Sequence, residues 1–310
     1  MVILHTIEEH TKMYKVILDT DLGDDIDDAF ALGLILKNSD VFDLLAVTTV
    51  YKNTKERALQ AKDLINLSDS NIDAFVGEST PIDGIITPFK DETGDLTKTR
   101  ICQYDDSMKD NLIKENAVDE IIRLSKEFDK ELIIITIGAM TNVAKAILKD
   151  PTIKNRIKMI LAMGGWYTNF VPEWNVLCDP AGYDIVFKSG IPYYGVGLDV
   201  TLKCPLEGDL FDTLRKSDDK LTKRIMTYFD KWIDYFHFEK SVLHDPLAVS
   251  YLIDNKVLEF KKVYASVVTS GEKRGSIEVS ETKKEGFNQI SYAYSVDKER
   301  FFNIIRKNFE

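Results

Sequence analysis

The chain has 310 residues, of which 44% are apolar and 29% are charged, with only 8 prolines and 16 glycines. This composition provides enough apolar surface for a large core and excludes disordered, collagen-like and low-complexity classes. Forty basic and 51 acidic side chains give a net charge of −11, which argues against nucleic acid and anionic membrane surfaces as partners.

The cysteines and the apolar runs bear on the cellular location and on membrane insertion. Cys102, Cys178 and Cys204 are odd in number, widely spaced and without a CxxC pair, which argues against a disulfide framework or a zinc site. We therefore expect a reducing, cytoplasmic location. The longest apolar runs, 29–36 and 132–140, are about half as long as a membrane span requires, so we expect no transmembrane segment.

Short β-branched or aromatic runs alternate along the chain with longer segments of helical period. This alternation is typical of parallel strands joined by crossover helices and predicts an α/β fold. The predicted strands are 15–18, 44–50, 72–76, 132–137, 159–162 and 193–196. The predicted helices are 28–37, 54–67, 117–128, 142–148, 180–189 and 220–238.

The pattern changes after Lys261. Three further strands, predicted to be antiparallel, surround a turn at 270–275, and a last helix follows; the ranges are 263–268, 276–279, 291–296 and 298–307. We expect an open, mostly parallel Rossmann-like sheet flanked by helices, with a small antiparallel C-terminal region. Residues 15–310 would form a single domain after an N-terminal extension, 1–14, and the polar stretch 91–110 would form a mobile loop.

The first predicted strand is followed by an unusually acidic segment. Six carboxylates lie within ten residues, in the run Asp19-Thr20-Asp21-Leu22-Gly23-Asp24-Asp25-Ile26-Asp27-Asp28. One or two of them could cap the following helix, but the mutual repulsion of six requires a cation. Ca²⁺ and Mg²⁺ prefer oxygen ligands, so this segment predicts a divalent metal site.

Two other segments offer oxygen donors. Gly138, in Ile137-Gly138-Ala139-Met140-Thr141-Asn142, allows a sharp turn that exposes carbonyl groups, although a plain strand-to-helix turn explains the segment equally well. Further along, Leu243-His244-Asp245-Pro246 places an imidazole beside a carboxylate at a predicted helix start, where the aspartate could be only an N-cap.

A third group of residues suits a polyhydroxylated ligand. The glycines of Met163-Gly164-Gly165-Trp166-Tyr167 allow a ligand to approach the backbone closely. Glu173-Trp174-Asn175 precedes Asp179-Pro180 and offers side chains that can bind vicinal hydroxyls. The aromatic residues fit a core position and a platform for a sugar or base equally well.

In this order the motifs resemble those of the nucleoside hydrolases, calcium-dependent N-ribohydrolases of the inosine-uridine type. The resemblance extends from Lys15 to the C-terminus. Seven motifs carry it: Asp19-Thr20-Asp21-Leu22-Gly23 with Asp27-Asp28-Ala29, Ala46-Val47-Thr48-Thr49-Val50 with Asn53, Gly138 to Asn142, Met163-Gly164-Gly165, Glu173-Trp174-Asn175 with Asp179-Pro180, Gly197-Leu198-Asp199-Val200-Thr201, and His244-Asp245-Pro246.

The resemblance implies a Ca²⁺ site and a ribose site. The implied metal ligands are the carboxylates of Asp21, Asp28 and Asp245 and the backbone carbonyl of Ile137, which stands where the family usually has threonine. The implied ribose-binding residues are Asp27, Asn53, Asn169, Glu173 and Asn175, with Met163 under the sugar.

The acidic motif departs from the family pattern in its length. An ungapped alignment puts Asp25 and Ile26 in the places of the paired carboxylates, which would set an apolar side chain against the metal. An alignment with two extra residues puts Asp27 and Asp28 there and brings the following helix into register. We prefer the gapped alignment and keep Asp25 as an alternative metal ligand.

The implied reaction is hydrolysis of the N-glycosidic bond of ribonucleosides to nucleobase and ribose, through an oxocarbenium-like transition state. Ca²⁺-bound water would attack, with Asp21 as general base and His244 as the leading donor to the departing base. Tyr228, Tyr235 and His237 are alternative donors and, with Trp166, candidates for the base pocket. Ordinary helix packing explains the first three equally well.

Two alternative functions remain open from the sequence. Asp19-Thr20-Asp21 after a strand also resembles the aspartyl nucleophile and acid of a Mg²⁺-dependent haloacid-dehalogenase-type phosphatase, which would release phosphate from phosphomonoesters. A calcium-dependent nucleoside-binding protein would be stabilised by nucleosides without releasing base. The family commonly forms dimers or tetramers, so we expect a homo-oligomer, and the nucleobase preference stays open.

Overall fold

The computed structural model describes residues 13–68, 70–87, 95, 98, 101–238 and 240–310. A nine-stranded sheet forms its centre, in the order β10-β9-β11-β6-β5-β4-β1-β2-β3. Six of the strands run parallel to one another: β1 (Tyr14–Thr20), β2 (Phe42–Thr49), β3 (Ala74–Phe75), β4 (Leu132–Thr136), β5 (Ile157–Met163) and β6 (Tyr193–Val196).

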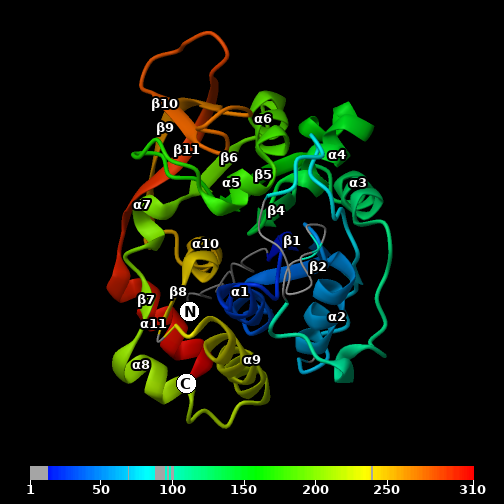
Figure 1. Ribbon diagram of the computed structural model, residues 1–310, viewed down its shortest axis with the longest axis vertical. Helices are drawn as coiled ribbons and strands as arrows, with labels where there is room; N and C mark the ends of the chain where they lie inside the picture. The colour runs from blue at the N-terminus through cyan, green and yellow to red at the C-terminus, as the bar shows by residue number, and fades with distance from the viewer. Residues whose placement is uncertain (1–12, 69, 88–94, 96–97, 99–100, 239) are drawn as a thin grey trace, which may run out of the picture.

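The C-terminal strands extend the same sheet. Strand β11 (Asn288–Val296) is parallel to β6, while β9 (Leu258–Val267) is antiparallel to β11 and β10 (Ile277–Ser280) is antiparallel to β9. The predicted α/β class, with a mostly parallel sheet and antiparallel C-terminal strands, is therefore confirmed. In Figure 1 the loop between β10 and β11 projects from the top of the molecule.

Helices cover both faces of the sheet. The main ones are α1 (Asp27–Leu36), α2 (Thr54–Ile65), α3 (Ala117–Glu127), α4 (Thr141–Lys149), α6 (Pro180–Ser189), α9 (Lys220–Phe236), α10 (His244–Ile253) and α11 (Lys298–Phe309). Successive residues of β1 enter different cores: Val16 and Leu18 pack with α1, α9, α10 and α11, whereas Ile17 packs with α3, α4 and α6. Burial on both faces explains the continuous apolar runs of the central strands.

Shorter elements lie between the main ones. They are α5 (Trp174–Cys178), α7 (Leu198–Thr201), α8 (Gly208–Leu214), the 3-10 turns Asp106–Met108 and Pro151–Asn155, and a two-stranded antiparallel sheet of β7 (Pro205–Leu206) and β8 (Ser241–Val242). Most of these are too short to show a period in the sequence, so they were not predicted.

The remaining differences from the predictions are at element ends. Strand β3 has two residues rather than five, because this edge strand pairs with β2 only at Ala74 and Phe75. The N-terminal extension lies almost entirely outside the described residues, as do 91–94, 96–97 and 99–100 of the predicted loop, whereas Met108 near its end is buried. Among the described residues no helix is both long and apolar enough to cross a membrane. The division into extension and single domain stays a prediction.

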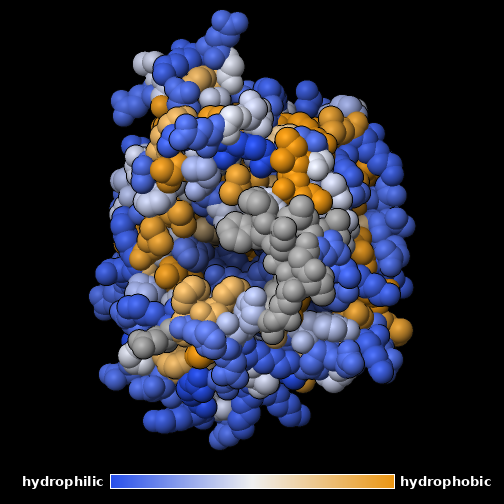
Figure 2. Space-filling model, in the orientation of Figure 1, coloured by the Kyte–Doolittle hydropathy of each residue, from blue (hydrophilic) through white to orange (hydrophobic). Residues whose placement is uncertain are grey.

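The topology gathers the candidate residues at one edge of the sheet. Asp19 of β1 pairs in register with Thr48 of β2 and Thr136 of β4, and Met163 of β5 pairs with Val196 of β6. The carboxyl ends of these parallel strands therefore open onto the same edge, where such sheets bind ligands. Figure 2 shows that this face is hollowed near its centre and that hydrophilic residues lie in the hollow.

Candidate active site

Three buried carboxylates converge where α1 and α10 begin. Asp27, Asp28 and Asp245 each contribute an oxygen within 4.8 Å of the others. The backbone N–H of Asp245 donates to Asp27 Oδ2 at 3.0 Å, and Thr20 Oγ1 donates to Asp28 Oδ1 at 2.5 Å. These bonds fix the orientation of two carboxylates while leaving further oxygens for a ligand. We call these three residues the acidic cluster.

The acidic cluster is electrostatically unfavourable without a cation. Burial and the neighbouring carboxylates raise the pKa values of Asp27, Asp28 and Asp245 well above the usual range. All of the available donors are carboxylate oxygens, which suit a hard divalent cation and not a soft metal. The residues therefore fit the predicted kind of metal site.

Asp21 lies beside the acidic cluster. Burial raises its pKa to about 7, against the lowering effect of the nearby Arg57 guanidinium, and its charge in turn raises the pKa of Asp28. A Cβ at Gly138 would lie 2.7 Å from Asp21 Oδ1, so only glycine allows this carboxylate to pack against the turn after β4. By contrast, Asp25 is exposed and is not part of the cluster.

Asp19 has a structural position. Its side chain is fully buried, and Oδ1 accepts hydrogen bonds from Thr48 Oγ1 at 2.6 Å and Asn142 Nδ2 at 2.7 Å. These bonds connect β1 to β2 and to α4. A nucleophile must reach its substrate, and this carboxylate does not reach the surface of the hollow. The position of Asp19 thus argues against the phosphatase alternative.

Arg57 is a functional candidate that the sequence analysis missed. It is fully buried in α2, where Nη1 donates to the carbonyl oxygens of Asp21 and Leu22 and Nε donates to that of Tyr51 at 2.9 Å. Nη2 pairs with Asp24 Oδ2 at 3.0 Å. Arg57 thereby joins the acidic loop to the loop after β2 and places a fixed positive charge beside the carboxylates. Its signal was a charged residue on the buried face of a predicted helix.

Glu173 and Asn175 belong to one hydrogen-bonded turn. Glu173 is the N-cap of α5, and its carboxylate accepts from the backbone N–H groups of Gly165 at 2.8 Å, Asn175 at 3.0 Å and Val176 at 3.2 Å. The Asn175 amide donates to the carbonyl oxygens of Ile137 at 3.0 Å and of Met163 at 3.2 Å.

These bonds tie α5 to the ends of β4 and β5. Ile137, Met163, Glu173 and Asn175 are all buried together there. The structure therefore brings four of the predicted metal-binding and ribose-binding residues into one connected group. Glu173 Oε2 accepts two of these N–H groups and Oε1 only one, so Oε1 has a further lone pair for a hydroxyl donor.

The other predicted ribose residues lie less deeply. Asn53 is half-buried at the start of α2, and its side chain makes no capping hydrogen bond. Asn169 is exposed on the loop between β5 and α5, and Trp166 on the same loop is half-buried.

His244 is the first residue of α10 and is half-buried. Its Nδ1 lies 2.7 Å from the hydroxyl oxygen of Thr201, at the end of α7. Burial disfavours the charged imidazolium and lowers the pKa of His244 to about 4, so the ring is neutral at pH 7. Thr201 belongs to a motif that carried the family resemblance, but the sequence did not assign it a role.

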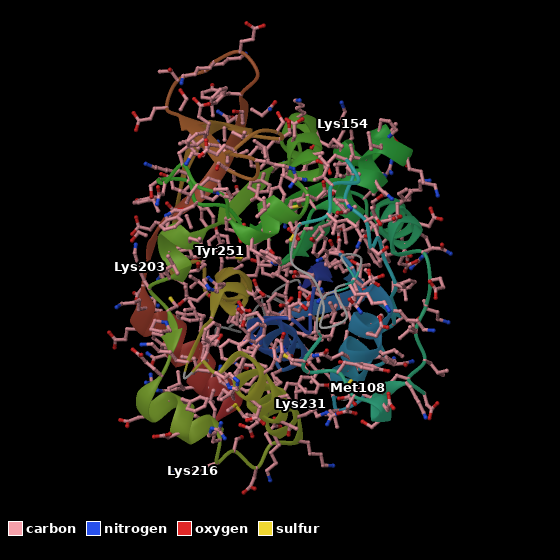
Figure 3. The ribbon with its side chains drawn as sticks, in the orientation of Figure 1. Met108, Lys154, Lys203, Lys216, Lys231 and Tyr251 are labelled. Carbon is pink, nitrogen blue, oxygen red and sulfur yellow. The ribbon has the colours of Figure 1, made fainter. Side chains whose placement is uncertain are left out.

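The structure places one of the predicted base-pocket residues in the core. Tyr228 is fully buried in the core, and its hydroxyl donates to Asp63 Oδ2 at 2.6 Å, which leaves no surface for a nucleobase. The reason is that Tyr228 is on the face of α9 that packs against segment 101–108. Figure 3 labels Met108 and Lys231, which belong to the two sides of this contact.

The two other α9 candidates lie near its C-terminal end. Tyr235 is half-buried, with its ring edge-on to Phe236 at 4.6 Å between centroids. His237 is exposed and ends the helix in the left-handed conformation, with φ of 56°.

The fold and this site define an α/β enzyme with a buried acidic centre at the carboxyl ends of parallel strands. The family model described as inosine-uridine preferring nucleoside hydrolase matches residues 16–303. The chain belongs to this family, and the protein is a nucleoside N-glycosyl hydrolase.

Individual relatives match over most of their length. A probable uridine nucleosidase 1 of Oryza sativa subsp. japonica is 28% identical, with 91% of this chain and 92% of the relative covered. The inosine-uridine preferring nucleoside hydrolase of Crithidia fasciculata is 27% identical, with 94% and 96% covered. Among solved structures, a purine-preferring ribonucleoside hydrolase from Gardnerella vaginalis is 28% identical with a TM-score of 0.76, covering 95% of this chain and 98% of its own.

Proposed function

We propose that the enzyme cleaves ribonucleosides to free nucleobase and ribose at a Ca²⁺ site built on the acidic cluster. The observation that carries this proposal is the convergence of Asp27, Asp28 and Asp245 within 4.8 Å, with Asp21 beside them. Such a concentration of buried negative charge suits a divalent cation and a positively charged transition state.

The proposed ligands are the carboxylates of Asp21, Asp28 and Asp245 and the carbonyl oxygen of Ile137. That oxygen already accepts from Asn175, but a carbonyl has two lone pairs and can also face a metal. When bound, Ca²⁺ would supply Lewis-acid chemistry, holding water and ribose hydroxyls and lowering the pKa of the water. Asp25 is the weaker alternative ligand because it is exposed.

The chain's own residues would then position the sugar. Asp27 is held by the backbone N–H of Asp245 through one oxygen, so its other oxygen is available to a ribose hydroxyl. Glu173 and Asn175, at the ends of β4 and β5, would bind further hydroxyls, as would the half-buried Asn53. Met163 would lie under the sugar, whereas the exposed Asn169 is the weaker candidate.

Two groups would move or share protons. Asp21 would accept the proton of the attacking water as general base. His244 would donate an N–H hydrogen bond to the departing nucleobase, because a neutral imidazole can stabilise the developing negative charge without first being protonated. The base would then take its proton from solvent.

Three broader features also remain proposals. We propose that residues 15–310 form a single domain, which is supported by a sheet that contains both β1 and β11. A cytoplasmic location is supported by three cysteines that form no disulfide. A dimer or tetramer follows from the family resemblance, and light scattering on the purified protein would test it.

A reducing-sugar assay tests the proposed activity. Inosine, uridine, cytidine, adenosine and guanosine would be incubated with the enzyme, with Ca²⁺ or after chelation. We expect ribose release from at least one nucleoside that stops on chelation and returns with Ca²⁺. The relatives' names differ in nucleobase, so the assay also identifies the preferred base. Stabilisation by nucleosides without ribose release would instead indicate a binding protein.

A further inference from the structure

Backbone pairing brings Thr201 to His244. The two-stranded sheet pairs Pro205 with Val242 and Leu206 with Ser241, and the N–H of Leu243 continues the pairing by donating to the carbonyl of Cys204 at 3.0 Å. Thr201 ends α7 just before this sheet, and His244 begins α10 just after it. The contact between the two side chains, at 2.7 Å, is thus set by the backbone.

The hydrogen bond has a preferred direction. Thr201 is fully buried, and within the described residues its hydroxyl makes no other hydrogen bond. A buried hydroxyl proton without an acceptor is unfavourable, so the hydroxyl donates to Nδ1. Nδ1 of a neutral imidazole can accept only when the ring proton is on Nε2.

We propose that Thr201 is a positioning residue that holds His244 as the Nε2–H tautomer and directs that N–H toward the departing nucleobase. The inference rests on the proposed function, in which His244 donates a hydrogen bond to the leaving group. It assigns a role to the last residue of the motif Gly197-Leu198-Asp199-Val200-Thr201. His244 neither gains nor loses a proton in this role.

His244 has the accessibility that this role requires. The ring is half-buried, Nδ1 is occupied by Thr201, and within the described part of the chain no protein group bonds to Nε2. Its neighbour Asp245 belongs to the acidic cluster, and both residues lie in the first turn of α10. The fixed ring would therefore lie beside the position of the sugar.

Two substitutions separate positioning from packing. Thr201→Val keeps the shape and removes the hydroxyl, whereas Thr201→Ser keeps the hydroxyl and serves as the matched control. With Ca²⁺ present, we expect Thr201→Val to lower kcat for inosine or uridine about tenfold, the scale of one hydrogen bond to the transition state, with little change in KM. Thr201→Ser should recover most of this loss. Turnover of p-nitrophenyl riboside should be retained, because its phenolate leaves without a hydrogen-bond donor.

The same kinetic measurements on His244→Ala and on the double variant complete a double-mutant cycle. If Thr201 acts through His244, adding Thr201→Val to His244→Ala causes no further loss on inosine or uridine. Equal losses of Thr201→Val on natural and p-nitrophenyl substrates, or full activity on both, would overturn the proposal. An additive loss in the double variant would do the same.

The tautomer has a readout that is independent of activity. Nitrogen NMR shifts of the imidazole distinguish a protonated Nε2 from a protonated Nδ1, and comparison with His244→Ala assigns the signal among the four histidines. We expect the Nε2–H form in the native enzyme and in Thr201→Ser, and its partial loss in Thr201→Val. An Nδ1–H form in the native enzyme would refute the inference about Thr201, whereas equal losses of His244→Ala on both substrate types would refute the leaving-group role of His244 itself.

Discussion

At the scale of single residues, Asp21 differs from the other carboxylates of the site. It lies against Gly138 and next to the Arg57 charge, outside the group formed by Asp27, Asp28 and Asp245. This position is compatible with two roles, since a carboxylate can bind the metal and still accept a proton. The two roles have different experimental consequences.

We expect Asp21→Asn to reduce kcat by about a hundredfold or more, the scale for loss of a general base. The amide keeps the shape and one oxygen, so circular dichroism and the melting temperature with Ca²⁺ should stay close to those of the native enzyme. Near-native turnover with metal bound would show that Asp21 is only a ligand and that another group takes the proton.

His244 and Asp245 are adjacent in the chain but have different proposed roles. The Asp245 carboxylate belongs to the acidic cluster, whereas the His244 ring contacts Thr201. We expect Asp245→Ala to weaken Ca²⁺ binding, measured by calorimetry, and to slow cleavage of every nucleoside. His244→Ala should strongly depress inosine or uridine cleavage, spare p-nitrophenyl riboside and leave Ca²⁺ affinity almost unchanged. A large drop in metal affinity in His244→Ala would contradict this separation of roles.

At the scale of elements, α9 shows how a helix face decides a residue's role. Its buried residues are spaced at three and four positions, which is the period of one helical stripe. They are Leu221, Thr222, Ile225, Met226, Tyr228, Phe229 and Trp232. Tyr228 is on this stripe, so the helical period alone predicts that it is buried. Its aromatic ring and hydroxyl had made it a candidate for the base pocket.

We expect Tyr228→Phe to leave kcat and KM near native values and to lower the free energy of unfolding by about 0.5–1.5 kcal/mol. The loss reflects one buried hydrogen bond to Asp63, which keeps its partner Arg224 at 2.7 Å. Chemical denaturation and nucleoside kinetics on the same sample would measure both quantities. A raised KM with unchanged stability would restore Tyr228 to the base pocket.

At the scale of the whole molecule, the buried carboxylates link stability to pH and to metal. Burial raises the pKa values of Asp19 and Asp21 to about 7, and those of Asp27, Asp28 and Asp245 are also raised. Between about pH 4 and 7 the folded metal-free protein therefore holds protons that the unfolded chain has lost. Stability from these groups falls as the pH rises through that window. The lowered pKa of His244 makes stability rise with pH instead. This is a single group, whereas the five carboxylates named above act in the other direction.

We therefore expect the chelated protein to melt at a lower temperature at pH 8 than at pH 5. Added Ca²⁺ should reverse most of this difference, because a cation favours the ionised carboxylates. At a hundredfold excess over Kd, binding to the folded state alone raises the free energy of unfolding by about 2.7 kcal/mol. Differential scanning fluorimetry measures the effect of pH and the effect of Ca²⁺ on the melting temperature, with Mg²⁺ as a parallel sample. Equal melting temperatures with and without Ca²⁺ at pH 8 would count against the metal site.

The sequence alone was sufficient for the class of fold and for the family, whose model the chain matches. Both depend on local patterns: apolar runs of the central strands, helical periods between them, and short motifs such as the six carboxylates within residues 19–28, at the end of β1 and just after it. That Asp28 and Asp245, far apart in the chain, share one site was implied by the family resemblance and not by a local pattern.

Only the tertiary structure decided how individual side chains share that site. Arg57 beside the acidic loop, Thr201 behind His244 and the burial of Tyr228 each depend on segments that are distant in sequence. The acidic motif also did not distinguish Asp25 from Asp27 as a metal ligand. In the structure, helix α1 begins at Asp27, and Asp25 lies exposed just before it. Periodicity specifies which face of an element is buried, whereas the partner on that face is set by how the elements pack.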